Sequence, residues 1–75
     1  MKHQLMEMMM SEIIKGGLIK HYEGVIGLAE ANVKIYMNHS VGIGEHADIL
    51  EAVDGELEKI ASADDKIKML EKYFS

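Results

Sequence analysis

The feature that most limits the fold is a stripe of apolar residues in the second half of the chain. Its members recur at spacings of three and four, apart from a gap of seven across Asp64, where Ala61 and Ala63 flank the expected apolar position. This period places them on one side of an α-helix and is close to that of a helical-bundle seam. It predicts one helix over residues 47–73, with a break near Ser62 as the less favoured alternative. The stripe comprises Leu50, Val53, Leu57, Ile60, Ile67, Leu70 and Phe74.

Acids and lysines three or four residues apart accompany this stripe and are expected on the outer side of the helix, where such pairs stabilise it. They are Glu56–Lys59, Asp64–Lys68 and Asp65–Lys68.

The first half of the chain also has a helical pattern, but a less uniform one. A first apolar face is followed by a second apolar run that continues to about Met37, and Gly16 and Gly17 lie between them. Each glycine inside a helix costs about 1 kcal/mol relative to alanine, so the pair indicates either a hinge or a break. The first face comprises Leu5, Met6, Met9, Met10, Ile13 and Ile14, and the second run comprises Leu18, Tyr22, Val25, Ile26, Ala29, Val33 and Tyr36.

Small residues form a further pattern in this half. Gly17, Gly24 and Ala31 recur every seven residues, with Gly27 between the last two. Small side chains on one stripe let another helix backbone approach closely, although glycines are also tolerated on a surface. We favour close packing, because the repeated cost of glycine must be offset somewhere.

The methionines at 6, 8, 9 and 10 allow two interpretations. Methionine is flexible and suits adaptable binding surfaces, so this segment could dock on a partner protein. We favour the alternative that it packs in the protein's own core or in a dimer seam.

Residues 38–46, with the sequence NHSVGIGEH, have the length usual for a connection between two helices. The structural turn is expected at Val41, Gly42, Ile43 and Gly44, where glycine permits unusual backbone conformations and the apolar pair seals the hairpin end.

A metal site in this connection is the alternative, because imidazole and carboxylate suit zinc, iron or manganese. No spacing fixes its candidate ligands relative to one another, so we expect no metal and no other cofactor. These candidates are His39, Glu45, His46 and Asp48.

A chain of 75 residues forms a single domain, residues 1–75. Such a chain buries only about 60–65% of the surface that its unfolded form exposes, so its core is marginal. The absence of cysteine excludes disulfides and thiolate metal sites as extra stabilisation. We therefore expect an all-α helical hairpin that dimerises into a four-helix bundle.

The net charge of −5 arises entirely in the second half. Residues 1–39 contain four lysines and four acids, whereas residues 40–75 contain four lysines and nine acids. An acidic surface repels phosphate, so nucleic-acid binding is not expected, and no apolar run has the length of a membrane span. The expected partners are a second copy and a basic protein, in the cytoplasm. The residues expected to bind the basic partner are Glu45, Asp48, Glu51, Asp54 and Glu58.

No catalytic motif stands out in this sequence. It has no cysteine, its serines lie in no nucleophile motif, and its glycines form no phosphate-binding loop. We expect a non-enzymatic interaction or structural module that acts as a homo-oligomer. Two alternatives remain open: a small metal-dependent enzyme at residues 39–48, and an acidic decoy that imitates nucleic acid and occupies a basic host protein.

The stretch from VGIGEH, residues 41–46, through the acidic segment after it resembles a group of small uncharacterised proteins. These are found mainly in marine bacteriophage and in ocean environmental sequence. The resemblance covers roughly residues 30–74. It implies a phage or marine microbial source and a cytoplasmic location in a bacterial cell, and it brings no activity or site residue with it.

Overall fold

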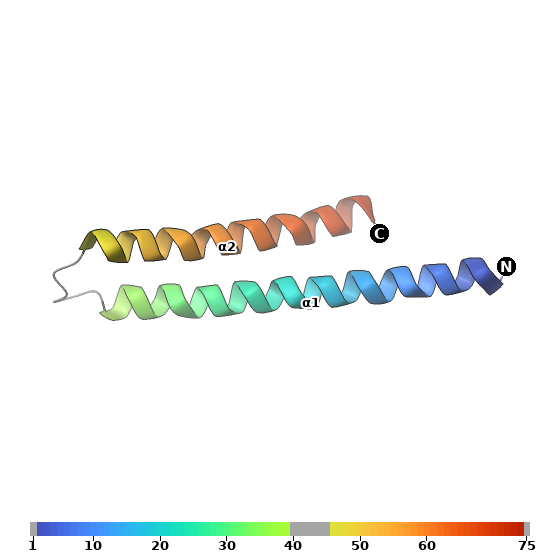
Figure 1. The fold of residues 1–75 in the computed structure, drawn as a ribbon, viewed down its shortest axis with the longest axis horizontal. Helices are drawn as coiled ribbons and strands as arrows, with labels where there is room; N and C mark the ends of the chain where they lie inside the picture. Colours follow the sequence, from blue (N-terminus) through green and yellow to red (C-terminus); the bar gives the residue numbers. More distant parts are fainter. Residues whose placement is uncertain (1, 40–45, 75) are drawn as a thin grey trace.

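The computed structural model describes residues 2–39 and 46–74, which form two α-helices packed side by side and antiparallel (Figure 1). Helix α1 spans Lys2–His39 with 38 residues, and helix α2 spans His46–Tyr73 with 28 residues. Within these two ranges there is no strand. The expectation of an all-α helical hairpin is confirmed.

Both helices are continuous. α1 runs through Gly16 and Gly17 without a break, and α2 runs through Ser62. Packing against α2 begins at the glycine pair, since Lys15, Gly16 and Ile19 are partly covered in the hairpin, whereas residues 2–14 are all exposed. In proteins, most helix stability comes from such packing rather than from residue propensity.

The two helices meet along seams with alternating spacings of three and four. This alternation is typical of coiled-coil packing, in which residues at these spacings all lie on one side of a helix and insert between side chains of the facing helix. The deepest positions belong to alanine: Ala29 is 2% exposed and Ala63 is 3% exposed, and no larger side chain that the structure describes is fully buried. The α1 seam comprises Ile19, Tyr22, Ile26, Ala29 and Val33, and the α2 seam comprises Ile49, Val53, Glu56, Ile60, Ala63, Ile67 and Leu70.

The apolar stripe predicted for α2 was partly wrong. Four of its members lie on the seam, but Leu50, Leu57 and Phe74 are exposed. Ala63, rather than Asp64, takes the seam position in the predicted gap. The seam is rotated toward Ile49, so that Leu50 and Leu57 lie at its edge and contribute less to the core.

The predicted ion pairs within α2 are partly confirmed. Lys59 Nζ lies 3.1 Å from Glu56 Oε1, and Lys68 Nζ lies 2.8 Å from Asp64 Oδ2. Its hydrogen bond to Asp64 raises the pKa of Lys68, and the charges of Asp64 and Asp65 act in the same direction. The placement of Glu56 on the outer side was wrong, because this residue lies on the seam.

The N-terminal end of α1 projects beyond the C-terminal end of α2 (Figure 1). α1 is longer by ten residues, which at the α-helical rise corresponds to about 15 Å. The methionines of this end therefore do not enter the core of the single hairpin. The apolar residues exposed on it are Leu5, Met6, Met8, Met9, Met10 and Ile13.

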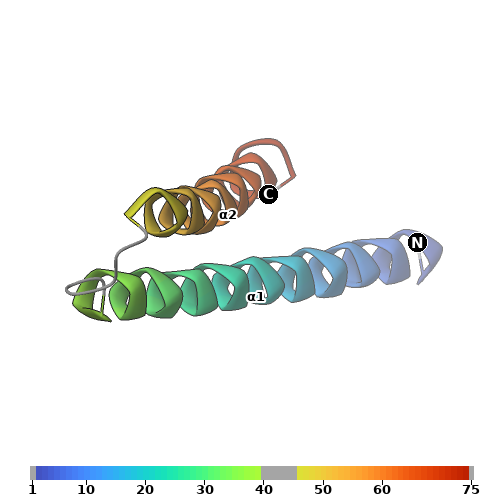
Figure 2. The same cartoon turned by 60° about the vertical axis from the view of Figure 1, so that its left-hand side comes forward.

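The hairpin is a thin rod, measuring 65 × 16 × 12 Å (Figure 2). Its radius of gyration is 18.0 Å, against about 11 Å for a globular domain of this length. Its accessible surface is 6177 Å², whereas a compact monomer of 8.4 kDa exposes about 4,600 Å². A single hairpin thus exposes about 1,600 Å² more than a globular protein of its mass.

Candidate functional site

The predicted metal site falls mostly on parts of the chain that the structure does not describe. Glu45 lies outside the described residues, and His39 and His46 are placed only as terminal residues of α1 and α2. Asp48 is exposed in the first turn of α2. Within residues 2–39 and 46–74, no three His, Asp or Glu side chains gather to hold a metal ion. The turn residues Val41, Gly42, Ile43 and Gly44 also lie outside the described residues.

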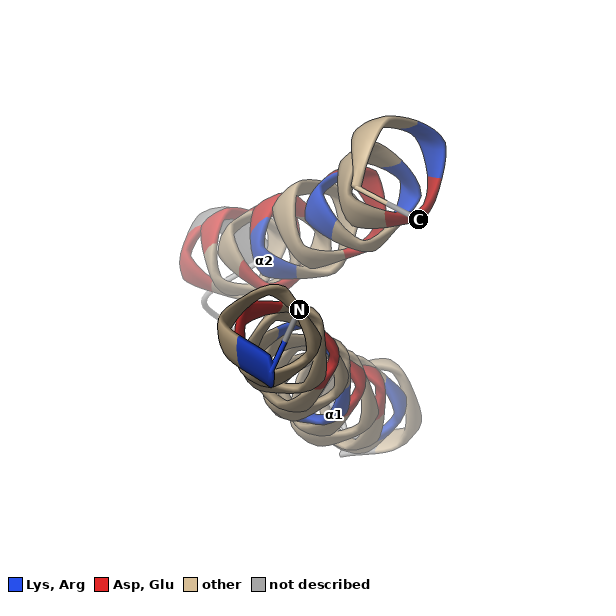
Figure 3. Ribbon diagram, turned by 90° about the vertical axis from the view of Figure 1, so that its right-hand side faces the viewer, with Lys and Arg blue, Asp and Glu red and all other residues tan. Residues whose placement is uncertain are grey.

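Three of the five residues predicted to bind a basic partner form one acidic surface on α2. Glu51, Asp54 and Glu58 are exposed, and their spacing places them on the side of α2 that faces away from α1. Asp48 is also exposed, but it lies about a quarter turn away from these three, on the flank of the helix. None of the four forms an ion pair with a lysine among the described residues. Acidic positions recur along α2 in the end-on view (Figure 3). The fifth residue, Glu45, is not described.

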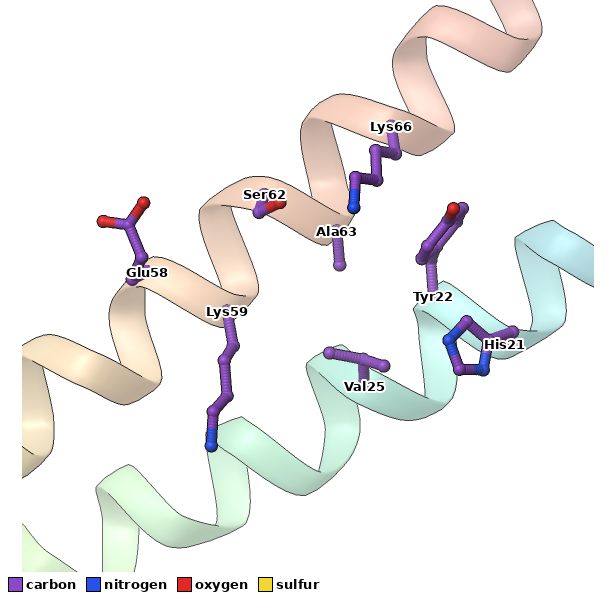
Figure 4. Close-up of a pocket in the computed structure, with 8 residues that line it drawn as sticks. All are labelled: His21, Tyr22, Val25, Glu58, Lys59, Ser62, Ala63 and Lys66. Carbon is purple, nitrogen blue, oxygen red and sulfur yellow. The ribbon is translucent and has the colours of Figure 1, made fainter.

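An open groove of about 350 Å³ lies between the two helices (Figure 4). Its two cations are already engaged: Lys66 Nζ lies 5.4 Å from the centre of the Tyr22 ring, and Lys59 pairs with Glu56. The rings of His21 and Tyr22 meet edge to face, with 5.3 Å between their centres. The groove is lined by His21, Tyr22, Val25, Glu58, Lys59, Ser62, Ala63 and Lys66.

The groove does not arrange these groups for nucleophilic catalysis. A serine nucleophile needs a general base within hydrogen-bond distance. In Figure 4, Ser62 on α2 and His21 on α1 lie on opposite sides of the groove, with Ala63 and Tyr22 between them. The residues that line the groove therefore hold the two helices together through apolar and cation–π contacts.

A polar contact interrupts the apolar seam at Glu56. The Glu56 side chain is only 12% exposed, its Oε1 accepts a hydrogen bond from Lys59, and its Oε2 is buried without a hydrogen-bond partner among the described residues. The hydrogen bond from Lys59 lowers the pKa of Glu56, against the opposing effect of burial, and Asn32 of α1 lowers the same pKa further. A polar residue on a seam favours one register of the two helices over others.

This position was missed at the level of sequence because glutamate was assigned to the outer face. A signal was present, since Glu56 stands three residues after Val53 and four before Ile60, in the rhythm of the seam.

Acid sensitivity should follow from Glu56. Because its pKa is lowered in the folded protein from the ordinary value of 4.5, its charged form stabilises the fold above that value. This stabilisation is lost as the pH falls through the lowered pKa. We expect the free energy of unfolding of Glu56→Gln, measured by urea denaturation between pH 7 and pH 3, to fall less steeply with acid than that of the wild type. Glu51→Gln, an exposed change on the same helix, is the control, and equal slopes for all three proteins would contradict the assignment.

Compared with known proteins, the chain matches no family model, no curated protein and no solved structure at a significant level. In the part of the chain that the structure describes, neither helix has the length and apolar character needed to cross a membrane. The resemblance to marine phage proteins at residues 41–46 stays a prediction, so function has to be inferred from the hairpin itself.

Proposed function

We propose that the protein is a non-enzymatic homodimer that presents the acidic surface of α2 to a basic partner protein. The observation that carries this proposal is the line of three exposed carboxylates, Glu51, Asp54 and Glu58, on the side of α2 that faces away from α1. Complementary charge raises the association rate and selects partners of opposite sign. The attraction weakens at high salt, because the screening length falls to a few ångströms.

The exposed surface of the hairpin supports the dimer. Its excess of about 1,600 Å² over a compact monomer is twice the roughly 800 Å² that each partner contributes to a standard interface. With only Ala29 and Ala63 buried among the described residues, the core is smaller than a stable domain of this length needs. A second copy would add apolar burial and produce an assembly of four helices.

Charge reversal tests the acidic surface. The triple variant Glu51→Lys, Asp54→Lys and Glu58→Lys removes it, whereas Glu12→Lys, Glu23→Lys and Glu30→Lys changes three exposed acids of α1 instead. Both variants move the net charge from −5 to about +1, because each replacement adds two positive charges. The comparison therefore separates the position of the acids from total charge.

We expect wild-type protein immobilised on beads to retain a discrete set of basic proteins from a bacterial lysate at low salt, and to release them at high salt. The α1 variant should retain the same set, and the α2 variant should retain at least about tenfold less, as expected for the loss of three charge contacts. Retention of nothing at low salt, or equal retention by all three proteins, would refute the proposal. Competition by added DNA for the retained proteins would identify the surface as an imitation of nucleic acid.

A further inference from the structure

A second apolar stripe runs along α1 on the side that faces away from α2, and we call it the back stripe. At about 100° per residue, its members lie opposite the seam formed by Ile19, Ile26 and Val33. All eight are exposed, so α1 has two apolar sides of which α2 covers only one. The back stripe comprises Met6, Met10, Ile13, Gly17, Gly24, Leu28, Ala31 and Ile35.

The order of spacings in the back stripe is the same in both directions. From Met6 to Ile35 the spacings are four, three, four, seven, four, three and four. A two-fold interface needs this property, because residue i must meet residue j of the second copy while j meets i. An antiparallel second α1 brings the following residues opposite one another: Met6 and Ile35, Met10 and Ala31, Ile13 and Leu28, Gly17 and Gly24.

The two glycines of the back stripe serve no contact within the hairpin. A Cβ atom on Gly17 or Gly24 would meet nothing within 4 Å, so packing against α2 does not require glycine there. Glycine nevertheless has a lower helix propensity than every residue except proline. Placed opposite each other near the two-fold axis, the two glycines let two α1 backbones approach closely, which offsets this lower propensity.

Charge favours the same arrangement. Residues 1–39 contain equal numbers of lysines and acids, whereas residues 40–75 contain the whole net charge of −5. Contact between two α1 helices therefore joins neutral elements and keeps the acidic α2 helices apart. The back stripe has no member between Gly17 and Gly24. Lys20 and His21, midway along its length, lie on either side of it, where long polar side chains reach water.

We infer that two copies pair through the back stripe, α1 against α1, antiparallel, with Gly17 of each copy opposite Gly24 of the other. The four helices then lie in one layer in the order α2, α1, α1, α2, instead of the closed four-helix bundle expected from the sequence, and both acidic surfaces stay on the outside. This inference rests on the dimer of the proposed function and specifies its interface.

Opposite charges introduced at paired positions test both the interface and its register. Leu28→Glu places two carboxylates in the interface, and Ile13→Lys places two ammonium groups there. Each variant alone should weaken the dimer at least about 100-fold in sedimentation-equilibrium measurements, as expected for uncompensated buried charge. An equimolar mixture should form a heterodimer again, because the lysine introduced in one chain then meets the glutamate introduced in the other.

Leu50→Glu is the matched control, since Leu50 of α2 is 70% exposed and Leu28 is 73% exposed. It should leave the dimer constant within about threefold, as is usual for a surface change outside an interface. Circular dichroism of the mixture, compared with each variant alone, shows whether any lost helix returns with pairing.

The outcomes separate the two proposals. Wild-type protein that is monomeric at micromolar concentration would refute the dimer and with it this interface. A wild-type dimer that Leu28→Glu does not weaken would refute only the α1 contact. A dimer that both variants weaken but their mixture does not restore would refute the antiparallel register.

Discussion

Replacing Ala63 by aspartate is expected to abolish the folded hairpin. Ala63 is 3% exposed at the centre of the seam, where Val25 and Tyr22 of α1 line the same groove. A carboxylate there would be buried against the seam, and the two lysines of the groove are already engaged, one with Glu56 and the other with the Tyr22 ring. Burying an unpaired charge costs several kcal/mol. That cost is comparable with the total stability of about 5 kcal/mol typical of a small domain. The expected result is the loss of helical circular dichroism and of cooperative urea unfolding.

Ala61→Asp is the matched control for this change. Ala61 lies two residues away on the same helix and is exposed, so its replacement shares the lower helix propensity of aspartate but not the burial. Ala61→Asp should lower the free energy of unfolding by about 0.5–1 kcal/mol. If the free energy of unfolding of Ala63→Asp lies within about 1 kcal/mol of that of this control, the two helices do not meet along Ala63 and the seam described above is wrong.

The helices themselves could be predicted from the sequence. For α2, the three-and-four spacing placed the helix at residues 47–73, within one residue of the observed His46–Tyr73. The buried face was predicted less well, because the candidate stripes through Leu50 and through Ile49 share four residues: Val53, Ile60, Ile67 and Leu70. Which of them is buried depends on where α1 lies, and that position cannot be derived from the pattern of one helix.

α1 was harder to predict because apolar residues lie on both of its sides. The rule that one apolar stripe marks the core does not distinguish Ile26, which faces α2, from Leu28, which faces away from it. The same ambiguity affected the small residues: Gly17, Gly24 and Ala31 were expected to pack closely on another helix, and within the hairpin they are exposed.

The candidate site was predictable where it depended on helix geometry. The exposure of Glu51, Asp54 and Glu58 follows from their spacing opposite the seam. The partial burial of Glu56 did not follow, because it depends on hydrogen bonding to Lys59 and on the approach of Asn32 across the seam. The role of Glu45 in a partner surface and the metal hypothesis for residues 39–48 stay predictions.

The double variant Gly16→Ala and Gly55→Ala is expected to be more stable than the wild type. Both lie inside helices, both lie outside the back stripe, and an added Cβ would meet nothing within 4 Å at either position. Alanine restricts the unfolded chain and favours the helix by about 1 kcal/mol per site. The double variant should therefore gain about 2 kcal/mol and melt about 10 °C higher.

The same pair of changes at Gly17 and Gly24 should give a different result. Within one hairpin these positions are equally open, so the helices gain the same intrinsic propensity. In the back-stripe dimer, however, four added methyl groups would separate the two α1 backbones and weaken association, by about tenfold or more for a loss of 1.4 kcal/mol. Sedimentation equilibrium and thermal melting at several protein concentrations measure the two effects separately. Should this variant gain as much stability as the first and dimerise as tightly, the glycines would have no part in the interface, and the register centred on them would have to be abandoned.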